Sequence, residues 1–354
     1  MFPFSLAYQM AVKLRNLLYD LKIFKEHTFH IPVIAVGNLT VGGTGKTPQI
    51  EYLIALFKNK YKLAVLSRGY KRKTKGFQLA RPDIKVHEIG DEPYQIYKKH
   101  EQITVAVDAD RVAGINKTCS LIPEINLFLL DDAYQHRRVK ADLYILLSCY
   151  DDLYVDDMML PSGKLREPIS GAKRSSIIII TKCPKQLSLE KKENVIKKLN
   201  IKPYQKIFFS TIRYNNYIKA ANQKLEISNL KQYDVLLVTG IANPKPLVEH
   251  LKEIDLKNLH QLEYADHSDY NHEKINEIKT KFKNIKATNK LVLTTEKDYT
   301  KLQKNIDNIY YIGIRSEFDN QEEFEELLKK RISEVSKLKA KSGTKNSVKD
   351  TIKQ

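Results

Sequence analysis

Hydrophobic and polar positions in the first part of the chain alternate between short apolar runs and segments of helical periodicity. Six runs rich in β-branched and other apolar residues predict strands at 31–36, 62–66, 102–108, 126–132, 141–147 and 175–182. Helical spacing predicts helices between several of them, at 46–57 and 92–100 among others. Apolar strands that alternate with helices are typical of a mostly parallel sheet with helices on both faces. We therefore predict an α/β fold for residues 31–213.

The same alternation returns on a smaller scale in the second part of the chain. Strand-like segments lie at 233–244, 290–298 and 308–314, and an amphipathic helix is predicted at 272–282. A last helix is predicted from Glu322 to about Leu338. This pattern predicts a second, smaller α/β unit at 214–340, joined to the first near residues 212–232.

The N-terminal segment, 1–30, has the pattern of an amphipathic helix. Its apolar residues recur at helical spacing, and they are Phe4, Leu6, Ala7, Met10, Ala11, Leu14, Leu17, Leu18, Leu21 and Phe24. Lys13, Arg15, Lys22 and Lys25 lie among them. The apolar stretch is too short to span a bilayer, and it lacks the features of a signal peptide. The segment either lies at a membrane interface or packs on its own domain, and both are compatible.

Charge changes this picture only at the C-terminus. The chain carries 60 Lys and Arg against 42 Asp and Glu, a net charge of +18, but part of that excess lies after residue 328. Residues 341–354 are basic and nearly devoid of apolar side chains, so we predict a disordered tail. The remainder is only moderately basic, and we predict no nucleic-acid partner. Three separated cysteines indicate a reducing compartment without structural zinc.

The segment after the first predicted strand has the pattern of a phosphate-binding loop. Its residues are Thr40, Val41, Gly42, Gly43, Thr44, Gly45, Lys46 and Thr47. The glycines allow backbone N–H groups to surround a phosphate, the lysine reaches the β- and γ-phosphates, and the next hydroxyl binds Mg²⁺. The usual pattern begins with glycine, and here Thr40 holds that position.

A second anchor for Mg²⁺ is expected where an apolar strand ends. Asp131 and Asp132 follow the run NLFLL, and the sequence alone does not decide which of them contacts the metal. A guanine-binding protein would carry N-K-x-D after a later strand. Residues 177–184 read IIIITKCP instead, so the aspartate is missing. The predicted nucleotide is therefore ATP rather than GTP.

Several further residues have the chemistry of an acceptor site. Asp91, followed by Glu92, opens a helix, where it serves either as a base for an alcohol or only as a helix cap. Arg111 and Arg166 are able to bind phosphate oxygens or simply to lie in solvent. His267 lies between acids in the second unit, and a single histidine is more often structural.

Taken together, these segments resemble the tetraacyldisaccharide 4′-kinase family, the lipid A kinases of Gram-negative bacteria. The matching segments run in order between residues 37 and 298, and they are GNLTVGGTGKTP, LSRGY, GDEP, DADR, DDAYQHRRV, LPSGKLREP, VTGIANP, YADHSDY and TTEKD. The family has the same threonine at the position of Thr40. The chain departs from many relatives at Ser268, where they have a second histidine, and at Ala133, where they have glycine.

The resemblance implies a P-loop NTPase-like kinase domain that transfers the γ-phosphate of ATP to the 4′-hydroxyl of a tetraacyldisaccharide 1-phosphate, a lipid A precursor, to give lipid IVA. It implies Asp91 as the base, paired with His267, with Mg²⁺ as cofactor and Glu92, Arg111 and Arg166 facing the substrate. It also implies a monotopic protein on the cytoplasmic face of the inner membrane, in contact with that surface through its N-terminal helix.

Two other readings remain open at this point. A P-loop GTPase or ATPase of metallochaperone type predicts a guanine motif or a Cys/His run, and the sequence has neither. A membrane- or nucleic-acid-binding module would use the charge of +18. It would have no use for the phosphate loop and the aspartate pair.

Overall fold

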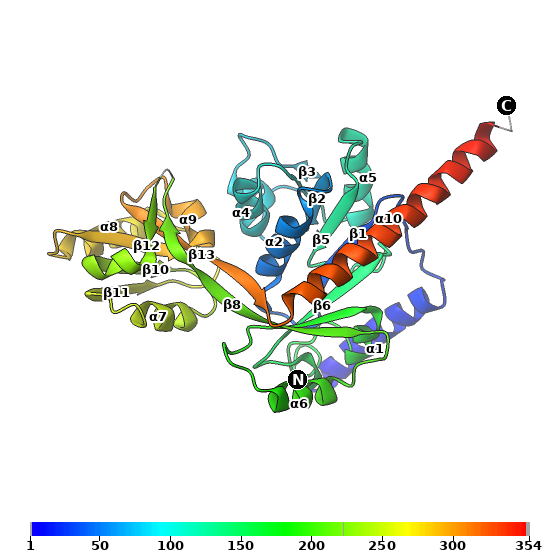
Figure 1. Ribbon diagram of the computed structural model, residues 1–354, viewed down its shortest axis with the longest axis horizontal. Helices are drawn as coiled ribbons and strands as arrows, with labels where there is room; N and C mark the ends of the chain where they lie inside the picture. The colour runs from blue at the N-terminus through cyan, green and yellow to red at the C-terminus, as the bar shows by residue number, and fades with distance from the viewer. Residues whose placement is uncertain (1, 222, 352–354) are drawn as a thin grey trace.

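The computed structural model describes residues 2–221 and 223–351, which form two α/β units side by side (Figure 1). The first unit contains α1 (Phe2–Asp20), β1 (Val33–Asn38), α2 (Lys46–Phe57), β2 (Leu63–Ser67), β3 (Gln78–Leu79), α3 (Val86–Ile89), α4 (Asp91–Lys99), β4 (Thr104–Val107), α5 (Arg111–Leu121), β5 (Leu127–Asp131), β6 (Leu143–Cys149), β7 (Ile177–Thr181) and α6 (Leu189–Leu199). Short 3₁₀ helices lie at Tyr154–Asp156 and Ile169–Arg174.

The strand β8 (Lys206–Lys219) leads from the first unit into the second. The second unit contains β9 (Lys224–Glu226), a 3₁₀ helix (Ile227–Gln232), β10 (Asp234–Thr239), α7 (Lys245–Lys252), β11 (Asn258–Glu263), α8 (His272–Asn284), β12 (Lys290–Thr295), α9 (Glu296–Leu302) and β13 (Ile309–Phe318). A long helix, α10 (Gln321–Thr351), follows.

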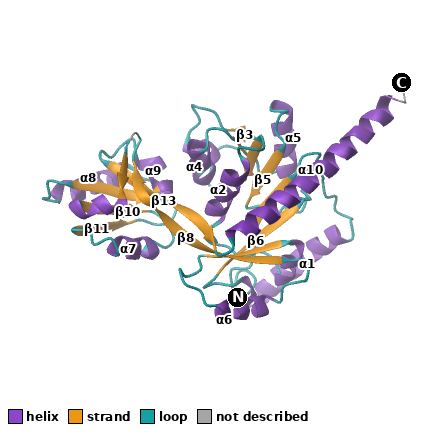
Figure 2. Cartoon of the chain, in the orientation of Figure 1, coloured by secondary structure: helices purple, strands orange, loops and turns teal. Residues whose placement is uncertain are grey.

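The sheet of the first unit is parallel except at its edge, in the order β3-β4-β2-β5-β1-β6-β7-β8. Only β3 runs antiparallel to its neighbour, β4. The central strand β1 is buried along its whole length, so both of its faces need a cover. Helices lie on both sides of the strands, as Figure 2 shows. The carboxyl ends of β1 and β5 lie together, because Val36 pairs with Asp131.

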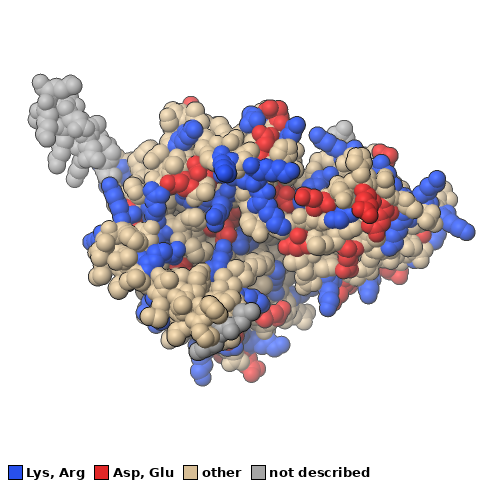
Figure 3. All heavy atoms as spheres, turned by 180° about the vertical axis from the view of Figure 1, so that it is seen from behind, with Lys and Arg blue, Asp and Glu red and all other residues tan. Residues whose placement is uncertain are grey.

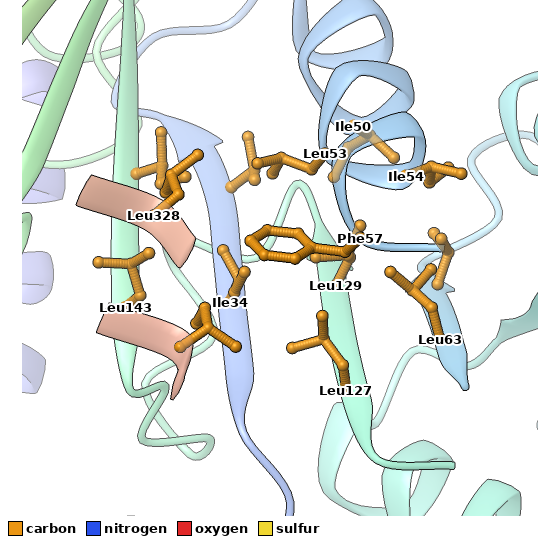
Figure 4. Close-up of a cluster of buried hydrophobic side chains, with 14 of the residues drawn as sticks. Ile34, Ile50, Leu53, Ile54, Phe57, Leu63, Leu127, Leu129, Leu143 and Leu328 are labelled. Atoms are coloured by element: carbon orange, nitrogen blue, oxygen red, sulfur yellow. The ribbon is translucent and has the colours of Figure 1, made fainter. Parts of the chain in front are cut away.

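Alternate side chains of β1 enter two different cores. Ile34 packs with α2 residues such as Leu53 and Phe57, and Leu328 of α10 joins the same cluster (Figure 4). Val33 enters the core on the opposite face, which α5 covers. This alternation follows from the two-residue period of a strand. It is the reason that an apolar run without polar breaks folds as a central strand here.

The two units share one continuous run of paired strands. The start of β8 pairs parallel with β7, and the rest of β8 pairs antiparallel with β13. The predicted boundary at 213/214 therefore falls inside a single strand rather than in a linker. The chain returns along β13, and Ser210 of β8 pairs with Phe318 at the end of β13. Figure 1 shows β8 and β13 running together between the units.

The C-terminal part of the chain differs from the prediction. The sequence pattern predicts that residues 214–340 belong to the second unit, but α10 packs on the first, where its apolar stripe of Phe324, Leu328 and Ile332 is fully buried. The backbone of α10 continues to Thr351, past the predicted end near Leu338. Residues 352–354 of the predicted tail lie outside the described residues, and disorder of the tail stays a prediction. Within the described parts of the chain, no helix is long and apolar enough to cross a membrane.

Candidate active site

The phosphate-binding loop lies between β1 and α2, as predicted. Gly42 and Gly45 have φ angles of 112° and 79°, a region that favours glycine. Gly45 caps α2 without any side-chain hydrogen bond, so the first N–H groups of α2 are left for another acceptor. The hydroxyl of Thr181, at the end of β7, donates to the Thr44 carbonyl over 2.8 Å. The loop is thus fixed from behind and presents a helix N-terminus suited to an anion.

Thr40 is accommodated because its part of the loop is extended. It forms an antiparallel bridge with Leu165, and the Val41 N–H donates to the carbonyl of Lys164 over 2.8 Å. The side chain of Asn38 donates to the Thr40 carbonyl over 2.8 Å. An extended residue in such a pairing does not require glycine. The entry position of the loop is held by the segment 164–166 instead.

Two cations share two acceptors at the mouth of the loop. Arg166 donates to both carboxylate oxygens of Asp132, at 3.1 and 2.8 Å, and to Oδ1 of Asn38 at 2.6 Å. Lys46 Nζ lies 3.3 Å from the same Asn38 oxygen and 3.7 Å from Asp132 Oδ1. Arg166 is therefore part of the loop's polar cluster rather than a solvated surface residue. Such a cluster concentrates positive charge where a polyphosphate would lie.

The two neighbouring aspartates have opposite environments. Burial and the charges of Glu92 and Asp132 raise the pKa of Asp131 to about 7. For Asp132, burial acts in the same direction, but the hydrogen bond from Arg166 and the charge of Lys46 outweigh it and lower its pKa to about 2. Oδ2 of Asp131 accepts from the hydroxyl of Ser67 over 3.2 Å, and its Oδ1 is buried without a partner among the described residues. Asp131 thus has an uncompensated oxygen, whereas Asp132 is already neutralised.

Arg111 lies beneath this carboxylate pair. It is only 2% exposed, its Nη2 donates to the backbone carbonyl of Asp131 over 3.3 Å, and its Nη1 donates to the carbonyl of Asp108. Burial lowers its pKa to about 10, so it stays a cation at neutral pH. Its guanidinium therefore positions the end of β5. Arg111 is therefore not a surface residue in contact with solvent.

Asp91 and His267 come together from different units. Asp91 is the first residue of α4, and His267 lies in the turn after β11, with a left-handed φ of 59°. The Nδ1 atom of His267 lies 3.1 Å from Oδ2 of Asp91, and Nζ of Lys301 lies 2.6 Å from the same oxygen. Gly90 occupies the cap position of α4, and no side chain caps it. Asp91 is thus not a helix cap, because its carboxylate faces the second unit.

Comparison with known proteins decides the family. The model of the family described as Tetraacyldisaccharide-1-P 4'-kinase matches residues 1–333. The chain belongs to this family. The resemblance inferred from the motifs is therefore confirmed.

Several curated proteins named Tetraacyldisaccharide 4'-kinase are similar to this chain. The one from Flavobacterium psychrophilum is 49% identical over 327 residues, which cover 91% of this chain and 93% of the relative. The one from Bacteroides thetaiotaomicron is 44% identical over 313 residues, covering 85% of this chain and 82% of the relative.

Among solved structures, the chain is similar to LpxK from Aquifex aeolicus, crystallised as an "apo" form in complex with ATP. The TM-score is 0.76 at 27% identity, and the match covers 94% of this chain and 98% of that chain. This similarity confirms the predicted P-loop NTPase-like α/β fold.

The structure adds three residues to this candidate site that sequence reasoning missed. Asn38 is fully buried and joins Lys46 to Arg166, Ser67 holds Asp131, and Lys301 pairs with Asp91. Asn38 and Ser67 each end an apolar strand, and a polar residue at that place was a usable signal. Lys301 carried no such signal, since it is one lysine among many on amphipathic helices.

Proposed function

We propose that this chain is an ATP-dependent kinase that phosphorylates the 4′-hydroxyl of a tetraacyldisaccharide 1-phosphate and yields lipid IVA. Membership of the family supports the activity. The structural observation that carries the proposal is the contact of Asp91 with His267. This contact brings a carboxylate and an imidazole from two units together at the N-terminus of α4. The next residue, Glu92, is close enough for its charge to raise the pKa of Asp131, so the pair lies near the phosphate loop.

The phosphate loop would bind the triphosphate of ATP. The uncapped N-terminus of α2 offers backbone N–H groups, and Lys46 and Arg166 offer charge. Both cations are held by Asn38 and Asp132, so phosphate oxygens would compete with these acceptors for them. A charge cluster that is already ordered stabilises the transferring phosphoryl group with little reorganisation.

The residues present fit a magnesium ion. The buried Oδ1 of Asp131 without a partner is the kind of oxygen that a hard cation satisfies, and burial has raised its pKa. Thr47, the second residue of α2, is half-buried and would supply a hydroxyl. Among the described side chains, those of residues 3–221 and 223–341, no group of three His, Cys, Asp or Glu is suited to a metal, so phosphate oxygens and water would complete the shell. When bound, Mg²⁺ would neutralise charge on the phosphates.

Asp91 would take the proton of the sugar hydroxyl. As the 4′-oxygen forms its bond to the γ-phosphorus, the bond from that phosphorus to the β,γ-bridging oxygen breaks and ADP leaves. The hydroxyl proton passes to the Asp91 carboxylate, while the imidazole of His267 stays in contact with Oδ2 of that carboxylate. Burial would raise the pKa of Asp91, but hydrogen bonds from His267 and Lys301 lower it below its ordinary value. The base is therefore ionised at neutral pH and ready to accept.

The helix α1 would bring the enzyme to its lipid substrate at the membrane surface. Phe4, Met10 and Leu14 are 72%, 64% and 57% exposed, while Val12 on another face is buried in the first unit. Figure 3 shows uncharged side chains gathered over the part of the surface where α1 lies, with Lys and Arg around them. Tyr8 donates to the carbonyl of Arg166 over 3.0 Å, which places the helix beside the phosphate loop. We propose contact with the cytoplasmic face of the inner membrane.

The test is phosphoryl transfer from radiolabelled ATP to tetraacyldisaccharide 1-phosphate in detergent micelles, with the product mapped by mass spectrometry. Label at the 4′ position that depends on the glycolipid supports the proposal. ATP hydrolysis that is indifferent to the glycolipid, or equal turnover of GTP, would instead favour a P-loop NTPase of another kind. Removal of Mg²⁺ with a chelator is expected to abolish transfer.

A further inference from the structure

The contact between the two units is organised by one short helix, α9, lying against α4. At one end of α4, Lys301 of α9 pairs with Asp91 at 2.6 Å. At the other end, Glu296 of α9 pairs with Lys99 at 2.8 Å. Two ion pairs of opposite polarity thus fix α9 along α4. Only the first of them includes a residue assigned to phosphoryl transfer.

Lys301 contacts both halves of the proposed dyad. Its Nζ atom lies against Oδ2 of Asp91 and also donates to the backbone carbonyl of Ser268 over 3.2 Å, next to His267 in the same turn. The lysine side chain is only 9% exposed. His267 Nδ1 approaches the same Oδ2, at 3.1 Å. The contacts of Lys301 and His267 therefore both use Oδ2 of Asp91. Its other oxygen, Oδ1, would accept the proton of the sugar hydroxyl.

We propose that Lys301 is a positioning residue of the phosphoryl-transfer site, which fixes Oδ2 of Asp91 and the turn that carries His267 in one geometry. The proposal rests on the proposed function, because Asp91 is taken as the base. A buried carboxylate with a single histidine partner is free to rotate about its own axis. An ammonium bonded both to Oδ2 and to the histidine turn removes that freedom. It also keeps the carboxylate ionised.

The charges around Asp91 set the direction of the expected effect. His267 faces it from the turn after β11, Lys301 and Lys297 face it from α9, and the Tyr270 hydroxyl lies within the range of its charge. Burial raises the pKa of Asp91, and the two hydrogen bonds and the lysine charges together lower it. Removal of the ammonium leaves the burial in place. The pKa of Asp91 is then expected to rise, so that its protonated, inactive form persists to higher pH.

A purely structural role for Lys301 predicts a different result. If the ion pair only tethers the units, its loss lowers thermal stability and scales activity equally at every pH. If Lys301 orients the base, its loss lowers kcat, leaves the KM for ATP nearly unchanged and moves the acidic limb of the pH profile to higher pH. These readouts separate the two roles.

The experiment compares Lys301→Met and Lys301→Arg with Lys99→Met. Lys99 is the control for a tether, since it forms the other ion pair between α4 and α9, with Glu296 at 2.8 Å. We expect Lys301→Met to lower kcat at neutral pH by about 10-fold or more. We expect Lys301→Arg to recover part of this loss. We expect Lys99→Met to lower thermal stability but to stay within about twofold of wild type in kcat, with the acidic limb at the wild-type position.

Transfer is measured from pH 3 to 9, because the pKa of Asp91 in the wild type lies below its ordinary value of 3.8. Thermal unfolding is recorded for each variant at each pH, and only folded protein is compared. If Lys301→Met does not fold, Lys301→Gln replaces it in the same series. An acidic limb at the wild-type position in the Lys301→Met or Lys301→Gln variant, or an equal loss of kcat in Lys99→Met, would overturn the proposal. Wild-type enzyme without any glycolipid phosphorylation would overturn the proposed function instead, so the two failures are distinguishable.

Discussion

Asp91 and His267 are 176 residues apart in the sequence, and Oδ2 of one lies 3.1 Å from Nδ1 of the other. The two residues belong to units joined by β8 and β13, so the pair exists only while those units are in contact. A change at that contact would therefore act on the geometry of the proposed base.

The first prediction concerns the coupling within this pair. Asp91→Ala and His267→Ala should each lower kcat by about 10²–10⁴-fold and leave the KM for ATP nearly intact, because a positioned base is lost in each. If the two side chains act as one unit, the double variant should be little worse than the poorer single variant. Glycolipid phosphorylation by all three variants is the measurement. Fully multiplicative losses would show independent roles.

Much of this site was predictable from the sequence, and the reason differs between residues. The phosphate loop and the aspartate pair follow apolar strands, so their place at the end of a parallel sheet follows from the pattern. The link between Asp91 and His267 came from family resemblance, since no local rule connects residues so far apart. Lys301 was not predictable, because its role depends on how α9 meets α4 in space.

The fold shows the same limit. Its class and most helices and strands follow from apolar periodicity. The assignment of α10 to the second unit did not agree with the structure, because an amphipathic stripe predicts a buried face and not the partner that buries it. The predicted boundary at 213/214 falls within β8, which pairs first with β7 and then with β13. Its mixture of apolar and polar residues does not show that one strand continues from the first unit into the second.

The second prediction tests the phosphate loop. Lys46→Ala and Thr47→Ala should each reduce phosphoryl transfer by about 10²-fold or more while thermal unfolding stays close to wild type. Neither side chain belongs to a hydrophobic core, so the fold does not depend on them. Raising Mg²⁺ should recover part of the activity of the Thr47 variant only. Near-normal turnover by Lys46→Ala would be incompatible with the proposed nucleotide site.

The third prediction concerns a buried carboxylate behind the site. Burial is the main cause that raises the pKa of Glu51 to about 7. Lys99 lies 2.7 Å from Glu51 and acts against this shift, but Lys99 also pairs with Glu296, whose charge raises the pKa of Glu51 further. A folded-state pKa above the ordinary value of 4.5 stabilises the fold at low pH. That contribution falls as the pH rises from about 4.5 to 7, by on the order of 2 kcal/mol.

Glu51→Gln removes this titration and keeps a hydrogen-bonding side chain. The half-buried histidines His100 and His136 act in the opposite sense, because partial burial lowers the pKa of each to about 4. The readout is therefore the difference in Tm between variant and wild type. The Tm of Glu51→Gln minus the Tm of wild type should increase as the pH is raised from 5 to 7.5. A difference that is constant over this range would show that Glu51 does not titrate there.

The last prediction concerns α1, and the structure suggests a sharper variant than deletion. Removing residues 1–25 would also remove the hydrogen bonds of Tyr8 to the Arg166 carbonyl and of Asn16 to Glu167, next to the phosphate loop. Changing only Phe4, Met10 and Leu14 to serine leaves those bonds in place, because these side chains are exposed.

The control variant carries serine at Leu121, Leu189 and Leu338, which are also exposed but lie on α5, α6 and α10. It removes a similar apolar area from surfaces that α1 does not form. Co-sedimentation with anionic liposomes should fall for the α1 variant and stay near wild type for the control. Each buried side chain contributes about 1.5–3 kcal/mol when fully transferred from water, so loss of three partly inserted side chains should weaken binding by at least 10-fold.

Phosphorylation of the glycolipid in detergent micelles should change less than phosphorylation in liposomes, since micelles carry the substrate to the site without a bilayer. Equal sedimentation of the two variants would mean that the exposed face of α1 does not bind the membrane surface.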